Sequence, residues 1–244
     1  MKIIFLNIWG GKIKNPLLDF FKKYSNSVDI FCLQEVFNGG KTARAIYKDD
    51  NMNIFREIGE RLPTHKGYFA ASEGNEEGLA IFVKKNITIE ETGDVFVFRH
   101  KDAMKNGDGK TLGRNLQYIS FVLDGKKYLV GNFHGLWNGI NKLDSDNRLK
   151  QSQKIINFLD ARNEDCKILG GDFNLLPETQ SVKMLEVDLK NLIKEYNITS
   201  TRSSFYTKPE KFADYCFVPP TVDVKQFEVL KDEISDHLPL LVEI

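Results

Sequence analysis

Residues 167 to 174 read Lys167-Ile168-Leu169-Gly170-Gly171-Asp172-Phe173-Asn174, an apolar run that stops in glycine and polar residues. The apolar part is typical of a buried β-strand, and the glycines permit a sharp turn after it. A side chain at the end of a strand is held rigidly by the sheet and still reaches solvent, so catalytic groups are often placed there. Taken alone, the pattern also fits an ordinary turn.

The same pattern, an apolar run next to an acidic, amide or imidazole group, recurs along the chain. The positions in chain order are Asn7, Gln34-Glu35, His134, Asp172–Asn174 and Asp236-His237. The last of them precedes an apolar run instead of following one. Each has a structural explanation when taken singly, as a turn former, a surface carboxylate or a structural histidine. Their recurrence along one chain favours a shared site.

Hydrophobic periodicity predicts many short strands and a few helices. The predicted strands are Lys2–Ile8, Val28–Val36, Gly67–Ser72, Leu79–Lys84, Val95–Phe98, Leu116–Leu123, Lys127–His134, Lys167–Asp172, Ala213–Val218, Phe227–Leu230 and Leu238–Glu243. The predicted helices are Pro16–Tyr24, Ala43–Leu62 and Leu143–Leu159, with a shorter one after Pro177. Asp144 and Asp146 fall near the start of the third helix, where negative charge suits the helix dipole.

Strands outnumber helices, and the Asp124-Gly125 pair is a hairpin signal. Two sheets packed together with helices outside therefore fit better than an open parallel sheet. A chain of 244 residues suits one large domain. We expect a single α/β domain over residues 1–244.

Lys+Arg and Asp+Glu are both 34, which gives a formal net charge of +0. This balance argues against a protein whose main task is to coat nucleic acid, but not against an enzyme that contacts a few phosphates. Cys32, Cys166 and Cys216 form no Cys-x-x-Cys motif, so neither a disulfide framework nor a zinc knuckle is indicated. The apolar start is too short for a signal peptide or a membrane span. A reduced, cytoplasmic location and no stable membrane insertion are the resulting expectations.

The recurring polar groups have a joint chemical purpose. Hydrolysis of a phosphoester needs neutralised phosphate oxygens, an activated water molecule and help for the leaving oxygen. Carboxylate and amide oxygens suit Mg²⁺ or Mn²⁺ better than zinc. The candidate oxygen donors are Asn7, Glu35, Asp172, Asn174 and Asp236. His134 and His237 are suited to proton transfer or phosphate binding.

At this point the sequence resembles the endonuclease/exonuclease/phosphatase superfamily, which includes deoxyribonucleases, abasic-site endonucleases, inositol-phosphate phosphatases and neutral sphingomyelinases. The matching blocks are Leu6-Asn7-Ile8-Trp9, Leu33-Gln34-Glu35-Val36, Asn132-Phe133-His134, Gly170-Gly171-Asp172-Phe173-Asn174, Ala213-Asp214-Tyr215 and Ser235-Asp236-His237-Leu238-Pro239. They follow the family order over nearly the whole chain. The resemblance implies a four-layer fold, a two-sheet β-sandwich with helices on both outer faces.

The resemblance also implies a metal site. Glu35 matches the principal metal carboxylate, with Asn7 beside it and Asp236 close to the same ion. The implied cofactor is Mg²⁺, with Mn²⁺ as an alternative.

The remaining matches imply roles in catalysis and substrate binding. Asp172 matches the aspartate that positions or activates the attacking water, and Asn174 matches the amide that holds the phosphate. His237 matches the histidine that contacts the scissile phosphate, and Asp214 the aspartate that orients it. His134 resembles the second histidine of the deoxyribonuclease, sphingomyelinase and inositol-phosphatase branches. Abasic-site endonucleases usually carry a tyrosine there, which disfavours a role in repair of abasic sites.

Two assignments stay open in the sequence. The carboxylate that partners His134 is either Glu76 or Glu77. Arg114 is either a phosphate contact or an ordinary arginine beside a strand. The polar stretch Arg99–Arg114 reads as a long exposed loop, either functional or merely solvated.

The predicted function is divalent-metal-dependent hydrolysis of a phosphoester bond. The favoured class is a nuclease or phosphodiesterase that acts on nucleic acid. Trp9, Phe133 and Trp137 lie beside the candidate site in the sequence and either stack on bases or serve as core or rim aromatics. A phospholipid headgroup, an inositol phosphate or another small phosphometabolite is the alternative substrate. A catalytically inactive binding module ranks third, because the catalytic positions are all present. We expect a monomer.

Overall fold

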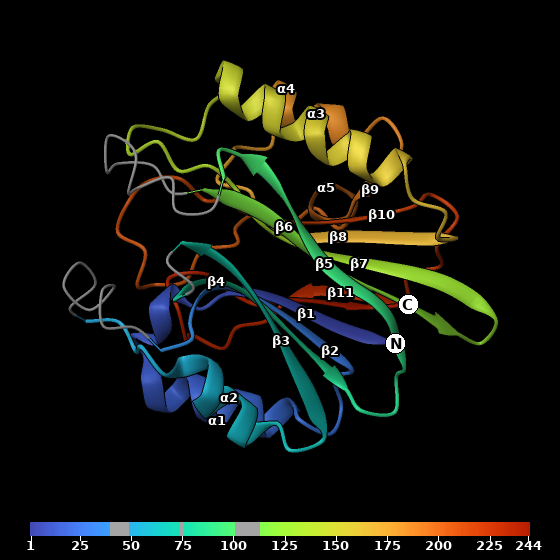
Figure 1. Cartoon of the computed structure of the whole chain (residues 1–244). Helices are drawn as coiled ribbons and strands as arrows, with labels where there is room; N and C mark the ends of the chain where they lie inside the picture. Colours follow the sequence, from blue (N-terminus) through green and yellow to red (C-terminus); the bar gives the residue numbers. More distant parts are fainter. Residues whose placement is uncertain (40–48, 74–75, 101–112) are drawn as a thin grey trace.

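Two six-stranded β-sheets face each other in the computed structural model, which describes residues 1–39, 49–73, 76–100 and 113–244 (Figure 1). The strand order of the first sheet is β11 (Gln226–Val229), β12 (Leu240–Glu243), β1 (Lys2–Asn7), β2 (Ile30–Phe37), β4 (Glu77–Lys84) and β3 (His65–Glu73). The order of the second is β5 (Ile89–Phe98), β6 (Arg114–Leu123), β7 (Lys126–His134), β8 (Cys166–Asp172), β10 (Asp214–Val218) and β9 (Lys190–Asn191).

Helices cover the outer face of each sheet (Figure 1). Helices α1 (Lys14–Tyr24) and α2 (Ile54–Arg61) lie on the first sheet, and α3 (Asp146–Asp160), α4 (Gln180–Leu185) and α5 (Leu192–Glu195) lie on the second. A 3-10 turn, η1 (Trp9–Gly11), follows β1. The four-layer α/β sandwich expected from the sequence is confirmed. None of the helices in the described ranges is long and apolar enough to cross a membrane.

The alternation of side chains along β1 builds two separate cores. Ile3 and Phe5 point between the sheets, whereas Ile4 and Leu6 point toward α1 and α2. Because successive strand residues face opposite sides, a strand that is apolar throughout must be covered on both faces. This is why a chain of short apolar runs folds into four layers instead of an open sheet.

The predicted strands are present, with small shifts at their ends, and three details differ from expectation. The helix expected over Ala43–Leu62 begins only at Ile54 and ends at Arg61; residues 49–53 are not helical, and 43–48 lie outside the described part of the chain. Strand β5 begins earlier than expected, at Ile89. Its first half is exposed and polar, so hydrophobic periodicity did not predict it. The two-residue strand β9 carries no periodicity and was not predicted.

Asp144 has a different role from the one expected. Helix α3 begins at Asp146 and is capped by Ser145, whose Oγ accepts a hydrogen bond from the Arg148 N–H. Asp144 instead accepts hydrogen bonds from the backbone N–H groups of Gln180 and Ser181, at the start of α4. It therefore ties two consecutive helices together.

Parallel strand pairs bring the polar strand ends to one end of the sandwich. Asn7 of β1 pairs with Gln34 of β2, and His134 of β7 pairs with Asp172 of β8. The chain termini lie at the opposite end, where Met1 N donates to Ile244 O at 2.7 Å (Figure 1). The pattern read in the sequence thus becomes a spatial cluster, because parallel strands end at the same edge.

A buried amide joins the two sheets beneath this cluster. Asn132 of β7 donates through Nδ2 to Leu33 O at 2.9 Å and to Ala80 O at 3.2 Å, both in the other sheet. Its Oδ1 accepts a hydrogen bond from Gln34 Nε2 at 2.7 Å. Asn132 and Gln34 are both 0% exposed. Leu33 lies where a β-bulge disturbs the pairing of β2 with β4, so Asn132 satisfies carbonyl groups at the bulge.

Replacing Asn132 with alanine should lower the free energy of unfolding by about 2–4 kcal/mol, because two buried carbonyl groups and one buried amide lose their partners. Urea unfolding of both proteins measures the difference. Gln153→Ala is the control, since Gln153 is exposed and bonds only Asn157, at 2.9 Å; its effect should stay within about 0.5 kcal/mol. A loss below about 1 kcal/mol for Asn132→Ala would show that the amide bridge does not hold the sheets together.

Candidate active site

Glu35 reaches the site because of a local irregularity in β2. The register between β2 and β4 shifts between Leu33 and Val36, as it does at a β-bulge. Glu35 has a φ of 57°, a left-handed conformation that is uncommon outside glycine. A bulge re-aims the side chain that it contains, so Glu35 leaves the strand alternation and faces the open end of the sandwich. Asn174, just past β8, has a similar φ of 53°.

Asn7 connects carboxylates of the two sheets. Its Nδ2 donates to Glu35 Oε1 and to Asp172 Oδ2, each at 3.0 Å. Its Oδ1 accepts a hydrogen bond from the Trp9 N–H at 2.9 Å. Because a backbone N–H can only donate, this bond fixes the orientation of the amide. Asn7 thus presents nitrogen to both carboxylates and positions them; its part in holding a metal ion stays a prediction.

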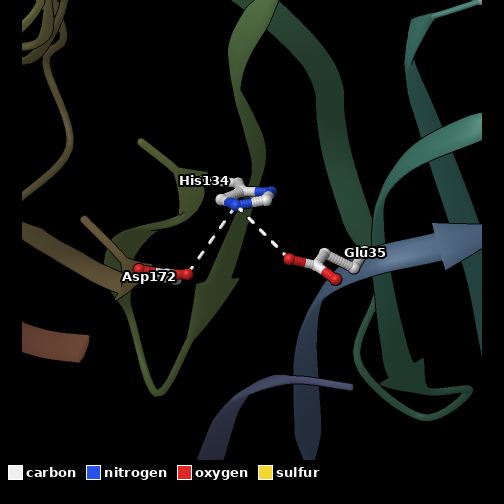
Figure 2. A group of neighbouring side chains, drawn as sticks. All are labelled: Glu35, His134 and Asp172. Carbon is white, nitrogen blue, oxygen red and sulfur yellow. Dashed lines mark ion pairs between the residues drawn. The ribbon is translucent and has the colours of Figure 1, made fainter. Parts of the chain in front are cut away.

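Asp172 lies at the centre of the site. Its Oδ1 accepts from the Asn174 N–H at 2.8 Å, and its Oδ2 lies 3.7 Å from His134 Nε2 and 3.6 Å from His237 Nε2. Figure 2 shows His134 between Asp172 and Glu35. Burial acts to raise the pKa of Asp172, but the neighbouring His237 and Lys142 outweigh it and hold the pKa below its usual range. Asp172 therefore stays ionised.

His134 is held neutral with its proton on Nε2. Arg114 Nη1 donates to His134 Nδ1 at 3.1 Å, and a guanidinium group has no acceptor. The proton of the neutral ring must then sit on Nε2, which faces Glu35 Oε1 at 3.8 Å. Burial, together with the charge of Arg114, lowers the pKa of His134 well below its usual value. His134 thus offers an N–H group to the site and no free lone pair for a metal ion.

His237 is in the opposite state. Its Nδ1 donates to Asp214 at 2.7 Å, and Asp214 also accepts from Thr201 Oγ1 at 2.7 Å. Burial by itself lowers the pKa of His237, but the carboxylates of Asp214, Asp172 and Asp236 outweigh it and raise the pKa. The pKa values of the two imidazoles are therefore shifted in opposite directions, toward the neutral form for His134 and toward the cation for His237, an arrangement suited to separate tasks in acid–base chemistry.

The carboxylates crowd together as they do around a divalent cation. Glu35, His134 and Asp172 each offer a ligand atom, and these atoms lie within 4.8 Å of one another. Burial, with repulsion from Asp236 and Asp172, raises the pKa of Glu35 to about 7 despite the hydrogen bond from Asn7. A second group, Asp172, Asp214 and His237, also meets this distance. Since His237 is already bonded to Asp214 and His134 carries its proton on Nε2, the carboxylates of Glu35 and Asp172, with Asp236, are the groups that face a hard cation.

The structure shows where Arg114 and Glu77 lie, two residues whose assignments the sequence left open. Arg114 is buried and bonds His134, so it belongs to the site. Glu77 is also buried, lines the cavity and accepts from Ser72 Oγ at 2.6 Å. Burial raises the pKa of Glu77, and the charge of Arg114 opposes this. Of the two glutamates, Glu77 faces the site, and it is linked to His134 through Arg114.

The aromatic residues divide into two groups. Trp9 and Trp137 line a cavity of about 540 Å³ at this end of the sandwich. Phe133 does not, because it is 0% exposed and packs edge-on against Phe173, with ring centroids 4.9 Å apart. The suggestion that Phe133 stacks on a substrate base is therefore wrong. Of the stretch Arg99–Arg114, residues 101–112 lie outside the described part of the chain.

Two cations of the cavity whose side chains are buried were missed in the sequence analysis. Lys142 Nζ donates to Asn174 Oδ1 at 2.9 Å, and Arg202 Nη1 donates to Asp236 Oδ2 at 3.2 Å. Both lie in irregular segments with no periodicity, where a lysine or an arginine reads as a surface residue. The nearest signal for Lys142 was its place in the short connection between the His134 strand and the following helix.

Comparisons with known proteins agree with this geometry. The chain belongs to the endonuclease/exonuclease/phosphatase family, whose model matches residues 4–237. The family accordingly places it among the phosphoesterases. No curated protein matches the chain by sequence.

Several solved structures share the fold. A mannosyl-6-phosphatase from Bacteroides thetaiotaomicron VPI-5482 is similar with a TM-score of 0.77 and 21% identity, over 100% of this chain and 98% of the other. A family protein from Leptotrichia buccalis C-1013-b has a TM-score of 0.75 and 19% identity, over 100% and 99%. The human Nocturnin catalytic domain has a TM-score of 0.64 and 18% identity, over 99% of this chain and 93% of the other. At these identities the likeness shows the fold alone.

The pairing of His237 with Asp214 makes a prediction about pH. Hydrolysis that needs cationic His237 should fall as the pH rises through its raised pKa. Asp214→Asn removes the largest influence that raises this pKa, so the alkaline limb of the kcat/KM profile should move to lower pH, with a loss of about 10- to 100-fold near neutral pH. Profiles measured at saturating metal concentration test this. An alkaline limb that stays in place would remove Asp214 as the partner that sets the charge of His237.

Proposed function

We propose that this chain is a divalent-metal-dependent hydrolase of phosphoester bonds. The observation that carries the proposal is the state of the two imidazoles. His134, whose pKa is lowered, and His237, whose pKa is raised, both direct Nε2 toward Asp172, at 3.7 and 3.6 Å, beside the carboxylate of Glu35. Hydrogen-bond donors from the two histidines, the carboxylate of Asp172 and the proposed cation site then surround one part of the cavity. The attack of water on a phosphate requires these groups together.

Glu35 and Asp236 would hold the metal ion, and Asn7 would keep Glu35 in place. Mg²⁺ is the ion that the oxygen donors favour, with Mn²⁺ as a substitute. When bound, the ion neutralises charge on the phosphate oxygens and polarises the phosphorus centre. It would also relieve the repulsion that raises the pKa of Glu35.

The side chains of the chain itself divide the remaining work. Asp172, fixed by Asn7 and by the Asn174 N–H, orients the attacking water. The Nε2–H of His134 donates to a phosphate oxygen, and the positive charge of His237 offsets the charge that develops in the transition state. The water oxygen forms the new bond to phosphorus, the ester P–O bond breaks, and the proton that the water loses balances the one that the leaving oxygen takes up to become an alcohol. Asp214 acts only through His237, which it orients.

The substrate classes to test follow from the cavity and from the family. Nucleic acid is the class that the sequence favoured, and Trp9 and Trp137 line the cavity where a base could stack. Inositol phosphates and lipid headgroups are the alternative. One structural relative is named as a mannosyl-6-phosphatase, which adds sugar phosphates to the panel. An inactive binding module is disfavoured, because Glu35, Asp172 and His237 all converge.

The proposal predicts metal-dependent hydrolysis that depends on Glu35. The purified chain, given Mg²⁺, Mn²⁺ or EDTA, should cleave at least one substrate of a panel of single-stranded DNA, duplex DNA, RNA, sphingomyelin, inositol phosphates and sugar phosphates. Glu35→Ala should cut the rate by at least about 100-fold. Mn²⁺ should raise the melting temperature of the wild-type protein but not that of the variant.

Glu178→Ala is the matched control, since the Glu178 side chain is 83% exposed and lies away from the site. It should retain both the activity and the stabilisation by metal. Activity that survives EDTA, or a Glu35→Ala protein that still responds to Mn²⁺, would contradict the metal assignment. Metal binding without cleavage of any substrate would contradict the proposed hydrolysis of this panel.

A further inference from the structure

Two cations reach the active site from loops and not from the sheets. Lys142 follows β7 and is only 2% exposed, and the Arg202 side chain, in the segment before β10, is 5% exposed. Each contacts a residue at the centre of the proposed chemistry: Lys142 bonds Asn174, and Arg202 bonds Asp236. Both line the same cavity. Neither has a direct part in the proposed chemistry, in which other side chains hold the metal ion and orient the water.

The loop that carries Lys142 is fixed from below by a buried arginine. Arg148 of α3 is 0% exposed and bonds the carbonyl oxygens of Leu136, Asn141 and Leu143, at distances between 2.5 and 3.3 Å. The backbone of Lys142 itself accepts from the Leu176 N–H at 2.9 Å. Burying a guanidinium group is costly unless its donors are satisfied. Here they are satisfied by one loop, so the loop is rigid and the position of Lys142 is determined.

The segment that carries Arg202 is equally fixed. Arg202 pairs with His237 as an isolated β-bridge, and Thr201 O accepts from the Leu238 N–H at 2.9 Å. The guanidinium carbon lies 3.9 Å from the centre of the Tyr206 ring, a cation–π contact. Within the described residues, the buried Arg202 Nε has no hydrogen-bond partner. An unpaired buried donor beside a cavity indicates a ligand that brings an acceptor.

The two cations also repel each other. Burial lowers the pKa of Lys142, and the charge of Arg202 lowers it further. Arg114, the third buried cation of the cavity, likewise has an Nε without a partner among the described residues. Like charges are held together in a buried site at a cost in stability, which a bound anion offsets. Three cations on three separate segments suit an anion with several oxygens.

We propose that Lys142 and Arg202, together with Arg114, bind the three terminal oxygens of a phosphomonoester and make this enzyme prefer monoesters to diesters. The inference rests on the proposed function, of which it names the substrate class. A phosphomonoester carries a charge of about −1.5 to −2 near neutral pH and three strong acceptor oxygens. A diester carries one negative charge and two such oxygens, so one of the three cations would have no terminal phosphate oxygen to bind. Nucleic acid backbones are then the poorer substrates.

The test compares two esters that share a leaving group, p-nitrophenyl phosphate and bis(p-nitrophenyl) phosphate, with the full chain and Mn²⁺. The wild-type kcat/KM should be higher for the monoester. Lys142→Met should lower the monoester value by about 10- to 100-fold, the effect of one lost charged hydrogen bond, and the diester value by less than about 3-fold. Arg202→Lys, which keeps the charge but loses the planar fork, should lower the monoester value by a smaller factor. Lys154→Met, on the exposed side of α3, is the control for loss of a lysine.

A second readout does not depend on turnover. Inorganic phosphate with Mn²⁺ should raise the melting temperature of the wild-type protein, and this increase should be lost in Lys142→Met but kept in Lys154→Met. A faster diester, an equal loss on both esters in Lys142→Met, or phosphate binding unaffected by Lys142 would each overturn the inference. Cleavage of the diester alone would leave the proposed function standing and refute the substrate class. If neither ester is cleaved, Lys142-dependent phosphate binding would still support this site, and the loss of that binding would overturn it, while the substrate panel above decides the proposed function.

Discussion

The active end of this molecule depends on one buried amide. Asn7 of the first sheet donates to Glu35, 28 residues away in the same sheet, and to Asp172, 165 residues away in the opposite sheet. Two carboxylates so close to each other, one of them buried, would repel, and an amide with two N–H donors offsets that repulsion without adding charge. This contact links the ends of the two sheets and places Glu35 of the first sheet next to Asp172 of the second.

The two active-site histidines have pKa values shifted in opposite directions because their neighbours differ. His134 meets a guanidinium group, Arg114, and is held neutral, whereas His237 meets a carboxylate, Asp214, and is held cationic. Both rings are buried, so burial alone would make both neutral. The second neighbour decides the charge, which explains why each histidine comes with a partner on an adjacent strand or segment.

The residues proposed for catalysis and those proposed for substrate selectivity are held in place by different parts of the fold. Glu35, Asp172 and His134 stand at strand ends, where backbone pairing between strands holds them. Lys142 and Arg202 stand on loops that side-chain contacts from Arg148 and Tyr206 hold in place. A sheet can stay the same while loops change, which fits solved relatives that share the fold at 18% to 21% identity.

The sequence by itself determined the strands and the cluster of polar groups, because both are local patterns: apolar alternation and a polar residue where it stops. It also placed Glu35, His134 and Asp172 next to apolar runs, whereas the parallel pairing that brings these positions to one end of the sandwich belongs to the tertiary structure. Only the tertiary structure decided that Glu77 and not Glu76 faces the site, because a bulge or a shift in register reverses which side a residue faces. Likewise, the orientation of Asn7 and the burial of Phe133 depend on residues far away in the sequence. The cationic pair Lys142 and Arg202 emerges only when loops more than 50 residues apart are packed against one cavity.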